Sequence, residues 1–352
     1  MPTPGFPAEL WLQILSYLPQ GTVRRMVSVS RTLYELYLDD FYKTIDFSSD
    51  SERMLEKFQR LRFESIARRV QYLHIRPTFF PKSNDGLDQS AFRRKIMLGI
   101  GRLRCRTAAA LPRPLKMALQ NPTFEVLDIP KRSLKHCQTI QELKITFRDQ
   151  KITPSFLYFI DSLWAADSIR PNIKKLFMDT TLVELPLFLK PVVQFSPTTT
   201  NLQVFNLELR LSNIEHTTAR WDRAIRILLS FFTAFKDTLS AITFSSEASH
   251  DYGLLFDSFP HIPHLKELQL LMHINEETFP RGAGSLTTFL SKHASDLEAF
   301  TVRPHPRFMT KSQSGDNLFY LWLNGEESTK SESIVELVFP NLHTFDVVVQ
   351  IP

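Results

Sequence analysis

The stretches IQELKI at 140–145 and IKKLFM at 173–178 share one pattern: an apolar residue, two variable residues, an apolar residue, one variable residue and an apolar residue. The same pattern starts again at Val70, Leu202, Leu239, Leu265, Leu297 and Leu342, and in a weaker form at Phe124. Its second and third apolar positions are two residues apart, so they face the same side of a β-strand. The pattern therefore predicts a series of short strands, each with one apolar face.

Segments of helical period separate several of these predicted strands. One opens at Thr153 or Pro154 and continues to Trp164, another extends from Trp221 to Phe235, and a third contains Leu286, Phe289 and Leu290. From Ile140 onward the strand patterns start 26 to 45 residues apart. Strand and helix units at this spacing predict a repeat architecture, in which each unit buries its apolar face against its neighbours. The alternative is an ordinary α/β domain in which the pattern recurs by chance.

The strand pattern resembles that of the leucine-rich repeat. The asparagine that this family places after the third apolar residue has no regular counterpart here, and the repeat spacing is longer and uneven. The resemblance implies a mixed α/β fold for residues 51–352: an irregular solenoid of short parallel strands with helices outside.

The first fifty residues form a separate unit. Leu10, Trp11, Ile14, Leu15 and Leu18 form a wide apolar stripe of helical period that ends at Pro19. A second short helix is expected after Gly21-Thr22, with Val23, Met26 and Val27, and a third after Ser30, with Leu33, Leu36 and Tyr37. Three short helices in ~40 residues cannot bury this much apolar surface among themselves. Either the rest of the chain or a partner protein must cover it.

The stretches FPAELWLQILSYLP at 6–19 and VSVSRTL at 27–33 resemble an F-box, of the type met in fungal F-box proteins. Phe6 replaces the commoner leucine, and Leu33-Tyr34 stands where the family usually has tryptophan. The resemblance implies that residues 1–50 form an F-box that docks on Skp1, and through it on a cullin–RING ubiquitin ligase. The implied Skp1 anchors are Phe6, Pro7, Leu10, Ile14, Leu15, Leu18 and Val27. A leucine-rich helical cap without a partner is the alternative.

The composition argues against catalysis. Only 10 of 352 residues are glycine, which leaves little material for phosphate-binding turns, and two cysteines cannot supply a four-cysteine zinc site. The dinucleotide, phosphate-loop, zinc-protease and serine-hydrolase motifs are absent from the sequence. We expect a protein that is not an enzyme and has no cofactor or metal. The amino-terminal residues do not read as a secretory signal, and no apolar run reaches ~18 uncharged residues. We therefore expect an intracellular protein of the cytoplasm or nucleus, without a membrane partner.

Residues 91–136 concentrate positive charge. This segment holds eleven lysines and arginines against Glu125 and Asp128, whereas the whole chain has a net charge of +5. Its candidate binding residues for an acidic or phosphorylated partner, or for nucleic acid, are Arg93, Arg94, Arg102, Arg104 and Arg106. A solvated charged face is the alternative. Only Phe92 and Phe124 interleave the charges, so a stacking surface for nucleic acid is poorly supported and we do not expect nucleic acid as the partner.

Together the two resemblances imply a substrate-recognition adaptor of a Skp1–cullin–F-box ligase, with an unknown protein as its target. The polar segments 303–316 and 324–333 are further candidates for reading that target. Two alternatives remain open. One is a Skp1-binding scaffold without a role in ubiquitination, and the other is a nucleic-acid-associated protein that uses residues 91–136.

Overall fold

The computed structural model describes residues 8–27, 31–47, 52–76, 132–147, 154–194, 201–210, 218–247, 250–272, 274, 278–281, 283–305 and 338–347. The structural statements below refer to these residues.

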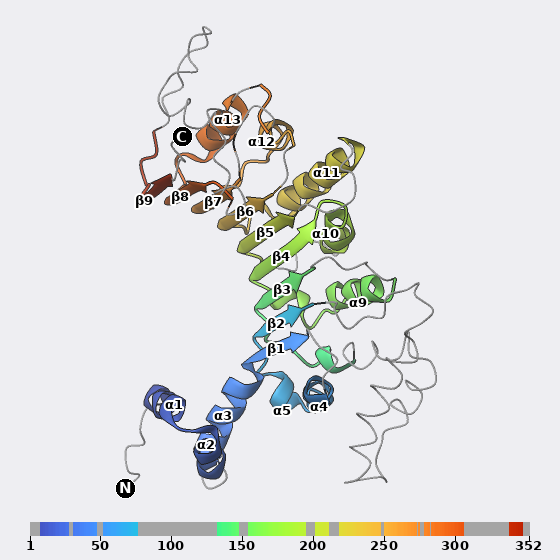
Figure 1. Ribbon diagram of the computed structural model, residues 1–352, viewed down its shortest axis with the longest axis vertical. Helices are drawn as coiled ribbons and strands as arrows, with labels where there is room; N and C mark the ends of the chain where they lie inside the picture. Colours follow the sequence, from blue (N-terminus) through green and yellow to red (C-terminus); the bar gives the residue numbers. More distant parts are fainter. Residues whose placement is uncertain are drawn as a thin grey trace.

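A single sheet of nine parallel strands runs through the described part of the chain, and each strand pairs with its neighbours in sequence (Figure 1). The strands are β1 (Thr44–Phe47), β2 (Tyr72–Ile75), β3 (Glu142–Thr146), β4 (Lys175–Thr181), β5 (Val204–Arg210), β6 (Ala241–Ser246), β7 (Glu267–Leu271), β8 (Ala299–Arg303) and β9 (Thr344–Val347). Because neighbouring strands are parallel, a crossover connection must bring the chain from the end of each strand back to the start of the next one. Each strand is placed beside the strand that precedes it in the sequence.

The register aligns equivalent positions of the repeated pattern. Leu73 of β2 pairs with Leu143 of β3, Leu143 pairs with Leu176 of β4, and the row continues to Phe345 of β9. A second row begins at Phe47 of β1 and is built from the third apolar position of each pattern. From β1 to β8 both rows are buried. They form the sheet's half of the core, as the period-two pattern requires.

Helices cover the apolar face of this sheet (Figure 1). They are α4 (Glu52–Arg60), α5 (Glu64–Ala67), α9 (Pro154–Trp164), α10 (Leu185–Gln194), α11 (Thr218–Phe235), α12 (Gly253–Asp257) and α13 (Gly284–His293), with a short 3-10 helix, η2 (Arg170–Asn172). Phenylalanine rings fill the space between the two layers. The Phe205 ring of β5, for example, lies 4.4 Å from that of Phe231 and 5.8 Å from that of Phe232 on α11. The core therefore accounts for many of the 29 phenylalanines.

Three helices, α1 (Ala8–Tyr17), α2 (Gln20–Val27) and α3 (Arg31–Lys43), precede the sheet. Helix α1 and helix α2 pack on α3, and α3 leads directly into β1. In Figure 1 this three-helix unit lies at the β1 end of the sheet, away from α9–α13.

The structure confirms the mixed α/β class and the parallel short strands. Each of the eight strong sequence patterns forms one strand, β2 to β9, and the three helices expected between them are α9, α11 and α13. The weak copy at Phe124 lies outside the described residues. Strand β1 and helices α4, α5, η2, α10 and α12 were not expected from the sequence.

Candidate partner-binding surfaces

Helix α1 presents a row of apolar side chains to solvent. Leu10 is 42% exposed, Ile14 is 39% exposed and Tyr17 is 79% exposed. Their spacing of four and three residues places them on one face of the helix. The helix packs against α3, and this row is the part of its apolar surface that the contact with α3 does not cover.

The structure assigns the predicted anchors to different environments. Leu10 and Ile14 lie together in the exposed row, whereas Leu15 and Leu18 are half-buried. Val27 is the last residue of α2, but its side chain, like Phe6 and Pro7 as a whole, lies outside the described residues. Tyr17 was not among the predicted anchors, although its position seven residues after Leu10 is the signal that places it in the row.

A buried arginine joins the three-helix unit to the sheet. The Arg69 guanidinium, 7% exposed, donates to the carboxylates of Glu35 and Asp39 on α3. It also donates to two backbone oxygens, that of Glu35 at 3.1 Å and that of Ser65 on α5 at 2.8 Å. Burial lowers the pKa of Arg69, but its bonds to the two carboxylates outweigh that effect, and the side chain stays charged. Arg69 thus connects α3 with the turn that leads into β2.

Helix α4 strengthens the same joint. Lys57 Nζ lies 4.5 Å above the ring of Phe41 on α3, and Arg60 Nη1 donates to the hydroxyl of Tyr42 at 3.3 Å. Tyr42 itself is fully buried in the core of the sheet. The end of α3 is therefore held from two sides, by α4 and by Arg69.

A pocket of about 540 Å³ opens beside this joint. Its lining residues are Glu35, Leu36, Asp39, Asp40, Lys43, Arg68, Arg69 and Gln71. Three carboxylates face three cations, so the lining presents no net charge to a ligand, and two of the carboxylates already bind Arg69.

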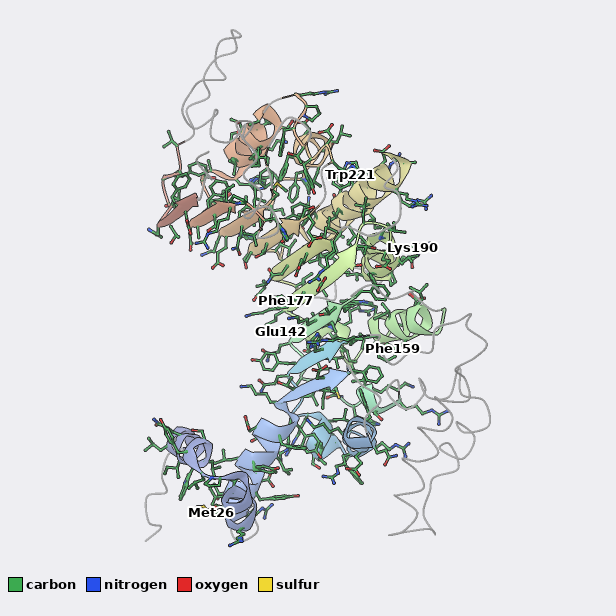
Figure 2. The ribbon with its side chains drawn as sticks, in the orientation of Figure 1. Met26, Glu142, Phe159, Phe177, Lys190 and Trp221 are labelled. Atoms are coloured by element: carbon green, nitrogen blue, oxygen red, sulfur yellow. The ribbon has the colours of Figure 1, made fainter. Side chains whose placement is uncertain are left out.

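Among the described residues, nothing covers the face of the sheet opposite the helices, which we call the open face. Figure 2 shows Phe177 and Glu142 on this face, whereas Phe159, Lys190 and Trp221 lie on the helix side. One residue of each strand forms the middle row of the open face, in the order Asp46, His74, Lys144, Phe177, Asn206, Thr243, Gln269, Thr301 and Asp346. From β5 to β8 the row is polar but uncharged, whereas from β1 to β4 it is charged and aromatic.

Several charges of this face are neutralised between neighbouring strands. Arg210 Nε lies 2.6 Å from Asp179 Oδ1, and Arg210 Nη2 lies 2.9 Å from Glu208 Oε1. Near the last edge, Arg303 of β8 pairs with Asp346 of β9. The Arg210–Asp179 and Arg303–Asp346 pairs link consecutive strands, whereas the Arg210–Glu208 pair lies within β5.

A histidine network joins the first three strands on the open face. Arg76 Nε donates to His74 Nε2 at 3.2 Å. An arginine N–H can only donate, so Nε2 must accept and the ring proton lies on Nδ1. That nitrogen faces Asp46, with Nδ1 and Oδ1 3.7 Å apart, while Nε2 also lies 2.9 Å from Thr146 Oγ1.

The five arginines predicted as an acidic-partner patch, Arg93, Arg94, Arg102, Arg104 and Arg106, lie outside the described residues. Of the basic segment 91–136, only residues from Arg132 onward are described, and Arg132 and Lys135 are exposed. Most of the polar segment 303–316 and all of 324–333 also lie outside the described ranges. These predictions stay untested.

Two buried titratable side chains, Cys137 and His293, have structural roles in the core. Burial raises the pKa of the Cys137 thiol to about 12, so it is a protonated, unreactive group. His293 Nδ1 lies 2.9 Å from the Phe289 carbonyl, and its Nε2 accepts from the Ile262 N–H at 3.1 Å. Both ring nitrogens are therefore occupied by backbone groups, and the imidazole has a structural role.

Two further features concern the described residues alone. They contain no group of three or more histidine, cysteine and acidic side chains placed to hold a metal ion. Their helices are too short or too polar to cross a bilayer.

Comparison with known proteins adds no relative: the sequence matches no protein-family model and no curated protein sequence. The function is therefore inferred from the chain's own surfaces. These are the exposed row of α1, the joint at Arg69 and the open face of the sheet.

Proposed function

We propose that this chain is a non-catalytic substrate adaptor of a Skp1–cullin–F-box ubiquitin ligase. In this proposal the α1 unit is an F-box that docks a Skp1-like protein, and the sheet, as an irregular leucine-rich-repeat-like solenoid, holds a target protein on its open face. The other subunits of the ligase supply the chemistry, so the adaptor itself needs no catalytic residue.

The exposed row of α1 is the observation that supports the proposal most directly. Fully burying a leucine or isoleucine side chain contributes roughly 1.5–3 kcal/mol. Leu10 and Ile14 retain about 40% of their surface for a partner, so together they offer on the order of 2 kcal/mol, and Tyr17 adds more. An apolar helix face of this kind fits the groove of a partner by helix-in-groove recognition.

The joint at Arg69 supports the second half of the proposal. An adaptor must hold its target at a fixed place relative to the ligase, and this requires a stiff connection between the two binding surfaces. Arg69 and α4 attach α3 to the start of the sheet, and α3 is also the helix on which α1 packs.

A pull-down with purified Skp1 tests the proposal. We expect the intact chain to bind, and the Leu10→Asp/Ile14→Asp variant to lose binding, because the new carboxylates would be buried without partners in an apolar interface. The matched control is Leu187→Asp on α10, which changes a side chain with the same exposure as Leu10, 42%, outside the three-helix unit. The control variant should bind as the intact chain does.

Other outcomes would contradict the proposal in distinguishable ways. Absence of Skp1 binding by the intact chain would refute the F-box interpretation. Skp1 binding without recruitment of a cullin would favour the scaffold alternative. Strong salt-dependent binding of nucleic acid, without Skp1 binding, would favour a role of the basic segment 91–136.

A further inference from the structure

Charge on the open face is not balanced everywhere. Asp179 and Glu208 share Arg210, which leaves a charge of −1 at the start of the uncharged half, and Asp46 faces His74. Between these pairs, Arg76, Lys144 and Lys175 form no ion pair among the described residues, and Glu142 is the one carboxylate beside them that also forms none. We call the six residues Tyr72, Arg76, Glu142, Lys144, Lys175 and Phe177 the β2–β4 patch. Its charge is +2.

The sheet register places an aromatic ring at the centre of this charge. Phe177 pairs with Lys144 across the β3–β4 ladder and follows Lys175 by two residues on its own strand. Neighbouring strands are ~4.8 Å apart and a step of two residues is ~6.6 Å, so both lysines border the ring. Phe177 is only half-buried, and both lysines are exposed. An apolar contact site is thus bordered by cations that are free to pair.

The composition of the patch is that of an interface centre. Tyrosine, phenylalanine and arginine are enriched where binding energy concentrates, and the β2–β4 patch has one of each. The adjoining half of the face, with Asn206, Thr243, Gln269 and Thr301 in its middle row, has no charge and no aromatic ring in that row. It can add complementary contacts, but it offers few strong ones.

We propose that the β2–β4 patch binds an acidic segment of the target protein, with an apolar side chain on Phe177 and flanking carboxylates on Lys144, Lys175 and Arg76. This inference rests on the proposed function, because it names the chemistry of the target that the adaptor would hold. Carboxylates complement the free charge of the patch, whereas a basic segment would be repelled. A nucleic acid fits less well, because Asp46, Asp179 and Glu208 border the patch and oppose a continuous polyanion.

The test uses the full chain and three short fluorescein-labelled synthetic peptides. All share a central Leu-Phe pair, which is flanked by glutamate in one peptide, by glutamine in the second and by lysine in the third. Fluorescence anisotropy should show that the glutamate peptide binds about tenfold more tightly than the glutamine peptide, and the lysine peptide more weakly than both. Added salt should reduce this preference, because the ion pairs lie at the surface.

Charge reversal makes the test specific to the patch. The Lys144→Glu/Lys175→Glu variant should prefer the lysine peptide, and Phe177→Ala should weaken binding of the glutamate peptide about tenfold. Two matched controls should keep the original preference: Thr243→Ala/Thr301→Ala in the uncharged half, and Arg102→Glu/Arg104→Glu/Arg106→Glu in the basic segment. Circular dichroism checks that each variant is folded. If the reversed variant does not fold, Lys144→Gln/Lys175→Gln should abolish the preference instead.

Several results would overturn the inference. These are equal binding of the three peptides, an unchanged preference in the lysine variants, loss of the preference only in the basic-segment variant, and tighter binding of single-stranded DNA at the same patch. The Skp1 pull-down separates the two proposals. If Skp1 does not bind while the peptide preference depends on Lys144 and Lys175, the adaptor proposal fails and the assignment of the patch stands.

Discussion

Replacing Arg69 by methionine should weaken the attachment of α3 to the sheet, so that α3 opens more often while the sheet stays folded. The variant keeps most of the side-chain stem and removes the guanidinium. The bond to the Glu35 backbone oxygen contributes about 1 kcal/mol. The bond to the Ser65 oxygen stays within the α5 side of the joint, so its loss does not change the opening of α3. The two ion pairs contribute no more than ~0.5 kcal/mol each, because Glu35 and Asp39 are 43% and 58% exposed and water screens them. The loss at the joint is therefore about 2 kcal/mol.

Hydrogen exchange measures this effect where it is expected. A change of about 2 kcal/mol corresponds to roughly a thirtyfold change in a local opening equilibrium. The amides of α3, residues 31–43, should exchange faster by about that factor in Arg69→Met, whereas those of β5–β7 should not change. Arg68→Met is the matched control, because Arg68 is adjacent and exposed. Unchanged exchange in α3, or an equal acceleration in Arg68→Met, would refute the assignment of Arg69 as the joint.

Two further predictions concern the stability of the sheet and its helices. Phe205 and Phe345 occupy the same row of the ladder, but Phe205 is fully buried and Phe345 is 55% exposed at the last strand. Phe205→Ala should reduce the free energy of unfolding by about 3–5 kcal/mol and Phe345→Ala by less than about 1 kcal/mol, as measured by urea unfolding. Similar losses of unfolding free energy in the two variants would contradict the argument that the cost depends on how deeply each ring is buried. Burial lowers the pKa of His293, whose ring also faces His261 and Asp296, so the unfolded chain binds the proton more readily than the folded one. The free energy of unfolding should therefore fall as the pH falls below about 6.5, and it should fall less in His293→Gln. Urea unfolding of both chains at several pH values measures this. An equal pH dependence in the two chains would disprove the assignment to His293.

The strands could be predicted because their signal is local. The apolar pattern residues of each strand, which are buried from β1 to β8, are two positions apart in the sequence, so eight of the nine strands follow from the pattern alone. Strand β1 obeys the same rule, with Tyr42, Ile45 and Phe47 all buried. It was missed because a tyrosine replaces the first aliphatic residue and because the segment lies inside the range expected to form the three-helix unit.

The helix α10 shows a limit of propensity. Pro191 lies inside it, and proline in a helix interior removes a hydrogen-bond donor. Burial of Leu185, Phe188 and Leu189 against the sheet outweighs that cost, which the local sequence does not reveal.

The candidate surfaces were predictable only in part. The exposure of Leu10 and Ile14 follows from helical period, because the stripe is wider than three short helices can cover. The β2–β4 patch does not follow from the sequence, because it depends on which charges are neutralised across strands. Asp179 and Arg210 are distant in sequence and become partners only when β4 and β5 pair.

The interval between β2 and β3 is unusual in length. Residues 76–141 lie between these strands, about twice the interval from β3 to β4, yet Tyr72 and Glu142 pair in register as neighbours do elsewhere in the sheet. Loop-closure entropy rises only with the logarithm of length, so doubling a connection costs about 0.6 kcal/mol. Leu134, Cys137 and Ile140 at the end of this interval belong to the core, so a change of length is expected to cost as little as this entropy only where it precedes them.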